Sequence, residues 1–440
     1  MKRVLILGAG LVSRPHVRYL LNVPGFEVTV ASRTVSKAEA LIQGHAQGRA
    51  LALDVDDQGA LDALIEECDL AVSLLPYVHH PVVARLCVKH RKHMVTTSYV
   101  KDAMRALDGA AREAGVVLLN EVGVDPGIDH MSAMKVIHNV ERRGGRITSF
   151  DSWCGGLPAP EANDNPLGYK FSWSPKGVLL AGRNPARFLK DGQIVEVPGE
   201  ELFDHYWTVQ IQGLGEFECY PNRDSLPFME QYGIQPSGWM FRGTLRNLGW
   251  CATLKRIATM GYLEETPFVG QPASYRQLTA QLLGFEAGEG LEKRTAARWG
   301  LPRDAKPIAD LEWLGLFSDD PLPPGQHTPI DALTARMLKK MSYAPGQRDL
   351  LVMQHEFVAE YSDHKEAITS TMIDYGIPFG DTSMSRTVGL PAAIAVRLIL
   401  QGGIRVTGVH TPVIPEIYDP ILAELETQGI GLRERVEIIQ

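Results

Sequence analysis

Apolar runs alternate with helical patterns through the first part of the chain. The runs are rich in Val, Ile and Leu, which is typical of parallel strands that are buried on both faces of a sheet. We predict strands at 3–7, 27–31, 49–53, 69–75, 93–97 and 116–121. We predict helices between them, at 13–21, 36–46, 57–67, 78–90 and 101–114. Strands that alternate with helices in this way predict an α/β fold with a doubly wound parallel sheet.

The pattern changes after residue 130, where we predict a helix at 129–140 and a strand at 147–153. Further short strands are expected at 177–181, 193–197, 208–211, 216–220 and 350–360. This mixture indicates an α+β substrate domain, and the mostly helical pattern of 245–340 indicates an inserted lobe. A strongly apolar helix at 389–401 needs a large apolar surface, so we expect the chain to return there and pack on the first domain.

Three domains follow from these patterns, because 440 residues exceed what a single hydrophobic core usually holds. Residues 1–129, completed by 385–440, form the dinucleotide-binding domain. Residues 130–250 and 345–384 form the α+β domain, and 251–344 form the helical lobe.

The first strand runs into a glycine-rich turn, Gly8 to Ser13, at the start of a helix. This is the layout of a dinucleotide site in a Rossmann βαβ unit, where the glycines permit a tight turn and the helix N-terminus receives the pyrophosphate. Ser13 stands where the fingerprint has its third glycine. The second strand ends in Arg33 between two hydroxyl residues, Ser32 and Thr34, which suits a 2′-phosphate rather than a ribose 2′-hydroxyl. The residues therefore predict NADP rather than NAD.

Polar residues and turns follow the other strands of the predicted sheet. Asp54 ends the third strand, Leu75 the fourth and 97–99 the fifth, while 123–127 follow the sixth. In open α/β sheets ligands bind outside the carboxyl ends of the strands. We therefore expect these segments to meet in one crevice.

Three later segments have unusual compositions. Residues 151–187 mix polar, small and aromatic residues without helical or strand period, which predicts a binding loop or lid. The turn-like segments 220–225 and 242–246 carry arginines, and arginines suit bidentate carboxylate binding. For any one of these arginines alone, a surface ion pair is the simpler interpretation.

Composition narrows the class of partner. The formal net charge of −8 favours neither nucleic acid nor an anionic membrane, and we expect no membrane span of about 20 apolar residues. The five cysteines lack Cys-x-x-Cys spacing and the chain starts directly with a strand, so we expect a reduced, cytoplasmic protein without a signal peptide or zinc site. Serine-hydrolase, zinc-protease and P-loop motifs do not occur in the sequence.

Specific motifs are spread over both halves of the chain. They are GAGLVSRP (8–15), SLLPYVHHPVV (73–83), VTTSYV (95–100), NEVGVDPGIDH (120–130), CGGLPAPEANDNPLGYKFSWSPKGVLLAGRN (154–184), YPNRDS (220–225) and RGTLR (242–246). Together they resemble the saccharopine dehydrogenases of the NADP-dependent, L-glutamate-forming type. The resemblance implies a Rossmann domain, a mixed substrate domain and a helical third domain, with the C-terminus returning to the first. It also implies a homodimer and no metal.

The resemblance further implies the residues of two binding sites. For NADP they are Gly8, Gly10, Leu11, Val12, Ser13, Ser32, Arg33, Thr34, Asp54, Val55, Leu75, Thr97, Ser98, Val124, Asp125, Pro126 and Ser174. For saccharopine they are Ser98, Tyr99, Asp125, Arg223, Thr244, Leu245 and Arg246. Ser13 falls within GAGLVSRP and therefore looks like a trait of the family.

The substrate class agrees with the residues. Saccharopine joins the side-chain nitrogen of lysine to the α-carbon of glutarate and carries three carboxylates. Arg223 and Arg246 supply cations for them, with Lys170 and Arg242 as weaker candidates.

Oxidation at the lysine-side carbon gives an imine, which water converts to glutamate and 2-aminoadipate 6-semialdehyde. The proton transfers need a group near the reacting nitrogen, and the candidates are Asp125, Tyr99 and Cys154. We expect Asp125 to be the most important, because it lies beside the strand-end crevice, where it could hold the amine cation or a water. A small buried residue is the commoner fate of a cysteine such as Cys154.

Two alternatives stay open from the sequence. A reductase like carboxynorspermidine dehydrogenase, which couples an aldehyde to a diamine, needs fewer carboxylate contacts than the arginines supply. A non-catalytic, NADP-sensing Rossmann protein leaves the polar segments at 154–175 and 220–246 unexplained.

Overall fold

The computed structural model describes residues 1–439 and divides into two compact units. The first unit comprises Met1–Arg146 and Met372–Glu434, and the second comprises Ile147–Thr371 and Arg435–Gln440. The three-domain division, with boundaries at 129, 250 and 344, stays a prediction. Each unit is described by itself below.

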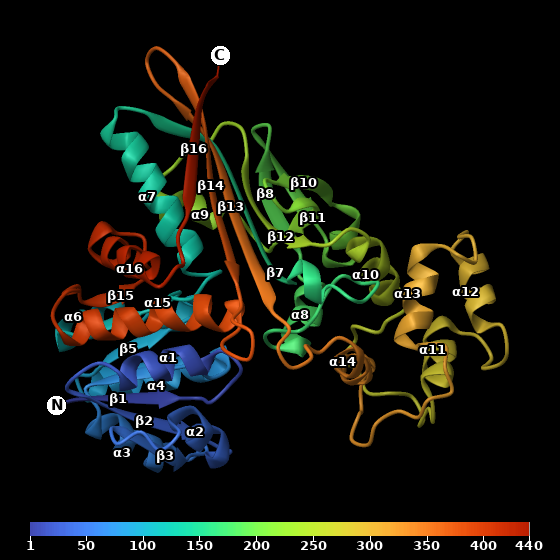
Figure 1. The fold of residues 1–440 in the computed structure, drawn as a ribbon, viewed down its shortest axis with the longest axis horizontal. Helices are drawn as coiled ribbons and strands as arrows, with labels where there is room; N and C mark the ends of the chain where they lie inside the picture. Colours follow the sequence, from blue (N-terminus) through green and yellow to red (C-terminus); the bar gives the residue numbers. More distant parts are fainter. Residues whose placement is uncertain (440) are drawn as a thin grey trace. The chain divides into compact units, whose positions relative to one another are not determined.

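The first unit is built on a parallel sheet of seven strands in the order β15-β6-β5-β4-β1-β2-β3 (Figure 1). The strands are β1 (Lys2–Leu7), β2 (Phe26–Ser32), β3 (Gly48–Ala52), β4 (Leu70–Ser73), β5 (His93–Thr96), β6 (Val117–Leu119) and β15 (Gly408–His410). All four residues of β4 are buried, as the apolar runs predicted for a sheet that is covered on both faces. The predicted doubly wound parallel sheet is confirmed.

Helices connect these strands. They are α1 (Ser13–Leu21), α2 (Val35–Ile42), α3 (Gln58–Glu67), η1 (Tyr77–His79), α4 (His80–Lys89), α5 (Asp102–Arg105), α6 (Asp108–Ala114), α7 (Ile128–Arg142), α15 (Ser383–Leu400) and α16 (Pro415–Thr427). The predicted helix at 101–114 is two helices, α5 and α6, with a short break between them. The other predicted helices differ from the observed ones only at their ends.

The apolar helix α15 packs against α1, so the chain returns to the first unit as expected (Figure 1). Gly389 of α15 permits this contact, because a Cβ there would lie 3.0 Å from the carbonyl oxygen of Val12. By length and composition alone α15 could also cross a membrane, although no membrane span was expected from the sequence. Its most apolar window is 72% buried inside the protein, the burial of a core helix.

The second unit contains a mixed sheet of nine strands with the main order β10-β11-β12-β7-β13-β14-β16, and β8 and β9 branch from β12. The strands are β7 (Arg146–Pro158), β8 (Ala186–Lys190), β9 (Gln193–Val197), β10 (Trp207–Ile211), β11 (Gly215–Pro221), β12 (Met240–Arg246), β13 (Asp349–Glu360), β14 (Lys365–Tyr375) and β16 (Arg433–Ile439). β12 runs parallel to β7 and antiparallel to β11.

Three local predictions in this unit were wrong. Residues 177–181 lie in a helix, α8 (Pro175–Ala181), because Ser174 caps its N-terminus and Pro175 favours the first helical position. Residues 242–246 form part of β12 rather than a turn. The predicted strand at 147–153 is observed, but it continues through 154–158 as part of β7, where a loop was predicted. Gly155 lets β7 approach β12, because a Cβ there would lie 2.8 Å from Leu245.

The remaining helices of the second unit include the lobe. They are η2 (Pro160–Ala162), η3 (Gly199–Asp204), α9 (Pro227–Tyr232), α10 (Trp250–Thr259), α11 (Tyr275–Leu283), α12 (Leu291–Arg298), α13 (Lys306–Leu314) and α14 (Pro329–Lys340). Their short length fits frequent glycine stops, such as Gly284 and Gly315 in the left-handed conformation.

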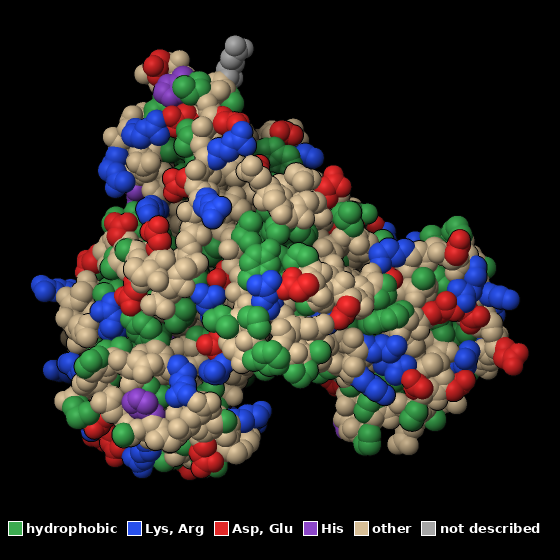
Figure 2. Space-filling model, viewed as in Figure 1, with side chains coloured by type: hydrophobic (Ala, Val, Ile, Leu, Met, Phe, Trp, Pro, Cys, Tyr) green, Lys and Arg blue, Asp and Glu red, His purple; other side chains and the backbone are tan. Residues whose placement is uncertain are grey.

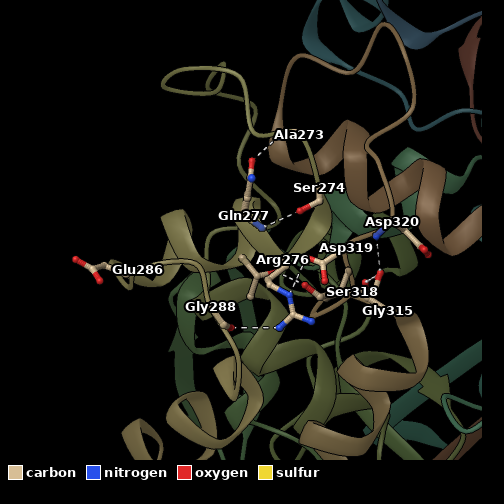
Figure 3. A network of polar contacts seen from close by, with 12 residues as sticks. Ala273, Ser274, Arg276, Gln277, Glu286, Gly288, Gly315, Ser318, Asp319 and Asp320 are labelled. Atoms are coloured by element: carbon tan, nitrogen blue, oxygen red, sulfur yellow. Dashed lines mark hydrogen bonds and ion pairs between the residues drawn. The ribbon is translucent and has the colours of Figure 1, made fainter.

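A polar network joins the lobe helices around Arg276, near the start of α11 (Figure 3). The Arg276 guanidinium donates to Asp319 at 2.9 Å and to the carbonyl oxygen of Gly288 at 3.3 Å. Ser274 caps α11 through its hydroxyl, which accepts from the amide of Gln277. These contacts lie between elements of the lobe and explain its polar loops structurally.

Basic and acidic side chains are interspersed on the face of the protein drawn in Figure 2. This mixing agrees with the moderate formal net charge of −8.

Candidate functional site

The turn between β1 and α1 has the geometry of an anion site. Gly8 has φ +115°, and a Cβ there would lie 3.0 Å from the carbonyl oxygen of Leu74. Nothing lies within 4 Å of where a Cβ of Gly10 would be, so the turn is open at this point. Among residues 1–439, no side chain caps the N-terminus of α1. The turn is therefore able to receive a pyrophosphate on its backbone amides.

Ser13, which stands where the fingerprint has its third glycine, is buried in this turn. Its hydroxyl oxygen lies 3.0 Å from the backbone nitrogen of Gly10 and accepts a hydrogen bond from it. The side chain thus holds the turn from inside, in a position where the fingerprint has a small residue for close packing. Leu11 and Val12 lie between these two residues, and Leu11 is exposed.

Arg33 follows the last residue of β2 and is exposed. Within the described part of the chain it makes no ion pair and no side-chain hydrogen bond. Its neighbour Ser32 accepts a hydrogen bond from the amide of Thr34, which shapes this end of the strand. Asp54 and Val55 follow β3, the next strand in the sheet. The free guanidinium fits a phosphate on the adenosine ribose, so the residues fit NADP.

The ends of β5 and β6 bring two predicted catalytic residues together. Tyr99 donates a hydrogen bond from its hydroxyl to Asp125 at 2.8 Å. Both side chains are half-buried. Thr97 and Ser98 precede Tyr99, and Val124 and Pro126 flank Asp125. Gly127 has φ +147° and packs against Gly123 so closely that a Cβ there would lie 2.1 Å from the Gly123 carbonyl oxygen.

A buried pair of residues holds these two loops. Glu121 has a positive φ of 61° and accepts a hydrogen bond from the amide of Val100 at 2.8 Å. Its second carboxylate oxygen lies 2.7 Å from Nε2 of His130, at the start of α7. His130 and Glu121 thus connect the start of α7 to the loop that carries Tyr99.

In the second unit, Arg246 ends β12 and is buried, with 6% of its surface exposed. Its guanidinium lies over the rings of Tyr169, at 4.9 Å, and Trp250, at 5.4 Å. It donates one hydrogen bond, to the backbone oxygen of Leu245 at 2.7 Å. Across residues 1–439, no carboxylate forms an ion pair with it. Because arginine stays charged, this buried cation is suited to bind an anion from outside the protein.

The phenols near Arg246 do not supply that charge. Burial raises the pKa of Tyr169, although the charge of Arg246 acts in the opposite direction. Burial likewise raises the pKa of Tyr220 to about 12. Both phenols are therefore neutral at ordinary pH and supply no counter-charge to Arg246. The buried Glu218 lies opposite Arg246 in strand register, but its carboxylate accepts from the amides of Gly249 and Cys251 and forms no ion pair with Arg246.

The other predicted cations differ from Arg246. Lys170 is buried, but it lies 2.8 Å from a carboxylate oxygen of Asp164 and donates to Gln347. Arg242 is buried with its guanidinium 4.1 Å from the ring centre of Phe228. Arg223 is exposed, has φ 62° and lies in the turn after β11. The sequence could not rank these residues, because burial and counter-charge come from the fold.

Three further predicted residues lie near β12 or α8. Cys154 is half-buried in β7 and pairs in register with Thr244 of β12. Leu245 is buried. Ser174 is exposed, and its hydroxyl caps α8. The structure thus brings Ser98, Tyr99 and Asp125 together in the first unit, and Cys154 and Thr244 together in the second. Leu75 lies just beyond β4.

Two family models together span nearly the whole chain. The Saccharopine dehydrogenase NADP binding domain matches residues 4–119, and the Saccharopine dehydrogenase C-terminal domain matches residues 123–430. The chain belongs to the saccharopine dehydrogenase family. The resemblance stated from the motifs is confirmed, and the N-terminal part of the family fold is an NADP-binding domain, as Arg33 predicted.

Relatives in this family match over nearly the whole chain. The saccharopine dehydrogenase [NADP(+), L-glutamate-forming] of Schizosaccharomyces pombe is 42% identical, with 99% of each chain covered. The mitochondrial alpha-aminoadipic semialdehyde synthase of Mus musculus is 38% identical over 98% of this chain and 47% of its own length. The apo structure of saccharopine dehydrogenase (L-Glu forming) from Saccharomyces cerevisiae is 40% identical. It has a TM-score of 0.91 and covers 99% of this chain and 100% of its own. The family fold is therefore shared over both units.

Proposed function

We propose that this protein interconverts saccharopine with L-glutamate and 2-aminoadipate 6-semialdehyde, with NADP as the hydride carrier. The names of its full-length relatives support this reaction. The observation in the structure that carries the proposal is Arg246, a buried cation between aromatic rings that lacks a carboxylate partner among the described residues. A substrate with carboxylates supplies the missing charge.

The three carboxylates of saccharopine need several donors. We assign Arg246 to one carboxylate, because its burial makes a bound anion strongly favourable. Arg223 is the second cation, and Thr244 supplies a hydroxyl beside Cys154. Lys170 has Asp164 as its own carboxylate partner, so we no longer count it among the substrate cations.

For NADP we assign the glycine turn to the pyrophosphate and Arg33 to the 2′-phosphate. NADP, when bound, supplies the acceptor for the hydride that leaves the carbon beside the secondary amine. The residues at the ends of β4, β5 and β6, including Leu75, Thr97 and Val124, border the same edge of the sheet as the glycine turn. They restrict where the substrate carbon lies, which is the protein's contribution to the redox step.

Proton transfer falls to the pair of Tyr99 and Asp125 in this proposal. Hydrolysis of the substrate imine needs a group that takes a proton from water, and Asp125 is a carboxylate at the sheet edge. The hydrogen bond from Tyr99 to one carboxylate oxygen orients the Asp125 side chain. Cys154 is the third candidate, located in β7 of the second unit.

Turnover tests this function directly. Saccharopine with NADP should give NADPH and glutamate in equal amounts, and NAD should be a much poorer acceptor. Carboxynorspermidine in the same assay tests the nearest enzyme alternative. Turnover of carboxynorspermidine but not saccharopine would overturn the proposed substrate, and tight NADP binding without turnover of either would favour a non-catalytic NADP sensor.

Asp125→Asn tests the proposed proton transfer. The variant keeps the size of the side chain and removes its basic oxygen, so kcat/KM should fall about 100-fold or more. Tyr99→Phe serves as the comparison variant, because it keeps the carboxylate and removes the hydrogen bond to it, and its loss should be smaller. Wild-type kcat/KM for Asp125→Asn across the pH range would remove Asp125 from the mechanism.

A further inference from the structure

A buried histidine lies behind Ser98 and has no role in the mechanism above. His80 is the first residue of α4 and is 3% exposed. Its Nδ1 lies 2.8 Å from the hydroxyl oxygen of Ser73, at the end of β4, and its Nε2 lies 2.8 Å from the hydroxyl oxygen of Ser98. A continuous chain of hydrogen bonds thus runs from a buried serine to a half-exposed one at the sheet edge. All three residues belong to the first unit.

The direction of these hydrogen bonds follows from Ser73. Its side chain is fully buried, and its one hydrogen bond within the described residues goes to Nδ1 of His80. A buried hydroxyl group needs an acceptor for its proton, so Ser73 donates and Nδ1 accepts. Thr96 competes for the ring from Nε2, but at the longer distance of 3.3 Å. Thr96 is buried too, but its contact, at 3.3 Å, is 0.5 Å longer than the 2.8 Å contact of Ser73 with Nδ1. We therefore take Ser73 as the donor, which places the ring proton on Nε2.

The imidazole is neutral in this environment. Burial lowers the pKa of His80 to about 4, with a smaller contribution from His79 in the same direction. A neutral ring has one donor nitrogen, so Nε2 donates to Ser98 and Nδ1 accepts from Ser73. The Ser98 hydroxyl oxygen therefore accepts a hydrogen bond from His80, and the Ser98 hydroxyl proton can be donated to another group.

The backbone of Ser98 is fixed as well. Its carbonyl oxygen accepts a hydrogen bond from the amide of Glu121 at 3.2 Å, and its amide donates to Thr96 at 3.4 Å. In the described part of the chain, the Ser98 hydroxyl has no acceptor among protein groups other than His80. Its proton is therefore available to a ligand at the carboxyl ends of the strands.

We propose that His80 is a positioning residue that fixes the Ser98 hydroxyl as a hydrogen-bond donor to an oxygen of a bound ligand. This inference rests on the proposed function for its ligands: the oxygen belongs either to a substrate carboxylate or to NADP. The Ser73–His80–Ser98 chain thus contributes to the selection of an oxygen-rich ligand at this edge.

A double-mutant cycle tests the coupling of His80 to Ser98. Ser98→Ala and His80→Leu should each weaken the same step by about 10-fold or more, as expected for a lost hydrogen bond to a charged ligand. The double variant should be no weaker than Ser98→Ala alone. His80→Gln, which keeps an N–H donor near the Nε2 position, should recover part of the loss.

The affected constant identifies the source of the oxygen. A higher KM for saccharopine with an unchanged Kd for NADP assigns it to the substrate, and the reverse assigns it to NADP. Additive losses in the cycle, or wild-type constants for either single variant, would overturn the positioning role. The kinetic constants of His80→Leu are compared only if its Tm is close to that of wild type. If it is not, His80→Gln and Ser73→Ala replace it. His80→Gln should then keep much of the wild-type affinity, and Ser73→Ala should lose part of it.

A spectroscopic measurement on the wild-type protein tests the same inference without turnover. Long-range proton–nitrogen NMR correlations, assigned with His80→Gln, should show His80 neutral and protonated on Nε2 between about pH 5.5 and 8. A proton on Nδ1, or a charged ring in this range, would contradict the proposal. If the enzyme fails to turn over saccharopine while this tautomer is observed, the proposed function fails and the geometry of the relay stands.

Discussion

Arg246 and Arg336 are both buried arginines of the second unit that lie over aromatic rings. Arg336, in α14, is 4% exposed and its guanidinium lies 4.6 Å from the ring centre of Tyr275. It donates to Asp320 at 2.6 Å and to the carbonyl oxygens of Leu314 and Gly315. Arg246 has similar burial and two rings, but one backbone hydrogen bond and no carboxylate among the described residues.

The presence or absence of an internal carboxylate separates a structural cation from a cation that binds a ligand. Burial and aromatic contact are common to both arginines, so neither property marks function. Counter-charge distinguishes them, and Lys170 with Asp164 belongs with Arg336 in this respect. A buried arginine without an internal anion is costly to keep, which is reasonable where a bound substrate supplies the anion.

Asp151 is an acidic residue that also lacks a charge partner of opposite sign. It lies in β7 near Glu356 and has no cationic partner in residues 1–439. Burial, with the charge of Glu356 as the second cause, raises its pKa to about 7. An acid can lose its charge by taking up a proton, whereas arginine cannot. Asp151 therefore tolerates burial alone, whereas Arg246 keeps its charge and is suited to bind an anion.

Arg246→Met is expected to have the largest effect of the variants that test this comparison. The substitution keeps an unbranched side chain between the two rings and removes the charge, so kcat/KM for saccharopine should fall about 100-fold or more. The loss should appear mainly in KM, because a carboxylate remote from the reacting carbon contributes to binding. Stability should be maintained or increased, since a buried uncompensated charge is removed. Steady-state kinetics and a thermal melt measure the two effects, and an unchanged kcat/KM would contradict this assignment.

The pH dependence of the free energy of unfolding tests whether Asp151 is protonated in the folded protein. Asp151 has a folded-state pKa above its ordinary value of 3.8, so the folded protein binds more protons between about pH 4 and 7. Stability from this group therefore falls as pH rises through that window and is level above it.

Asp151→Asn should remove this contribution and stabilise the protein near pH 7 by on the order of 3 kcal/mol. Urea unfolding at pH 5 and pH 7.5 measures it, with the exposed Asp363→Asn as the control. The same pH slope in wild type and Asp151→Asn would exclude the proposed protonation of Asp151.

Arg336→Met should affect stability and leave catalysis intact. Several hydrogen bonds from a charged group are lost, and the second unit should be destabilised by about 2 kcal/mol. Arg276→Met in the same lobe is the matched control, because Arg276 and Asp319 are more exposed and their pair should contribute less than about 1 kcal/mol. Urea midpoints rank the two variants. A large rise in the KM of Arg336→Met for saccharopine would show that counter-charge does not separate the two arginines.

The sequence predicted the first unit well because its strands are buried on both faces and its connections are short. Apolar runs and helical periodicity are then local properties, and α1 was predicted with its observed ends. β12 was missed because Arg242, Gly243 and Arg246 give it the composition of a turn. Its strand conformation comes from its neighbours β7 and β11, which lie far away in the sequence.

The residues of the candidate site also differ in how well they could be predicted from the sequence. The glycine turn and Arg33 were recognisable because they are local in sequence. The contrast between Arg246 and Lys170 was not, since it depends on the positions of Asp164, Gln347 and Trp250 in the fold. His80 was passed over for a similar reason: its partners Ser73 and Ser98 become neighbours only in the parallel sheet. A His-Pro pair at the start of a helix after a strand is the one local signal.

The central claim is that Arg246 receives a carboxylate of the substrate. Its most direct test is the shift in Tm that saccharopine causes in the presence of NADPH, measured for wild type, Arg246→Met and Arg336→Met. A ligand at 100 times its Kd stabilises the folded state by about 2.7 kcal/mol. We predict an increase in Tm for wild type and Arg336→Met and its near loss for Arg246→Met. Equal increases in all three proteins would contradict the claim.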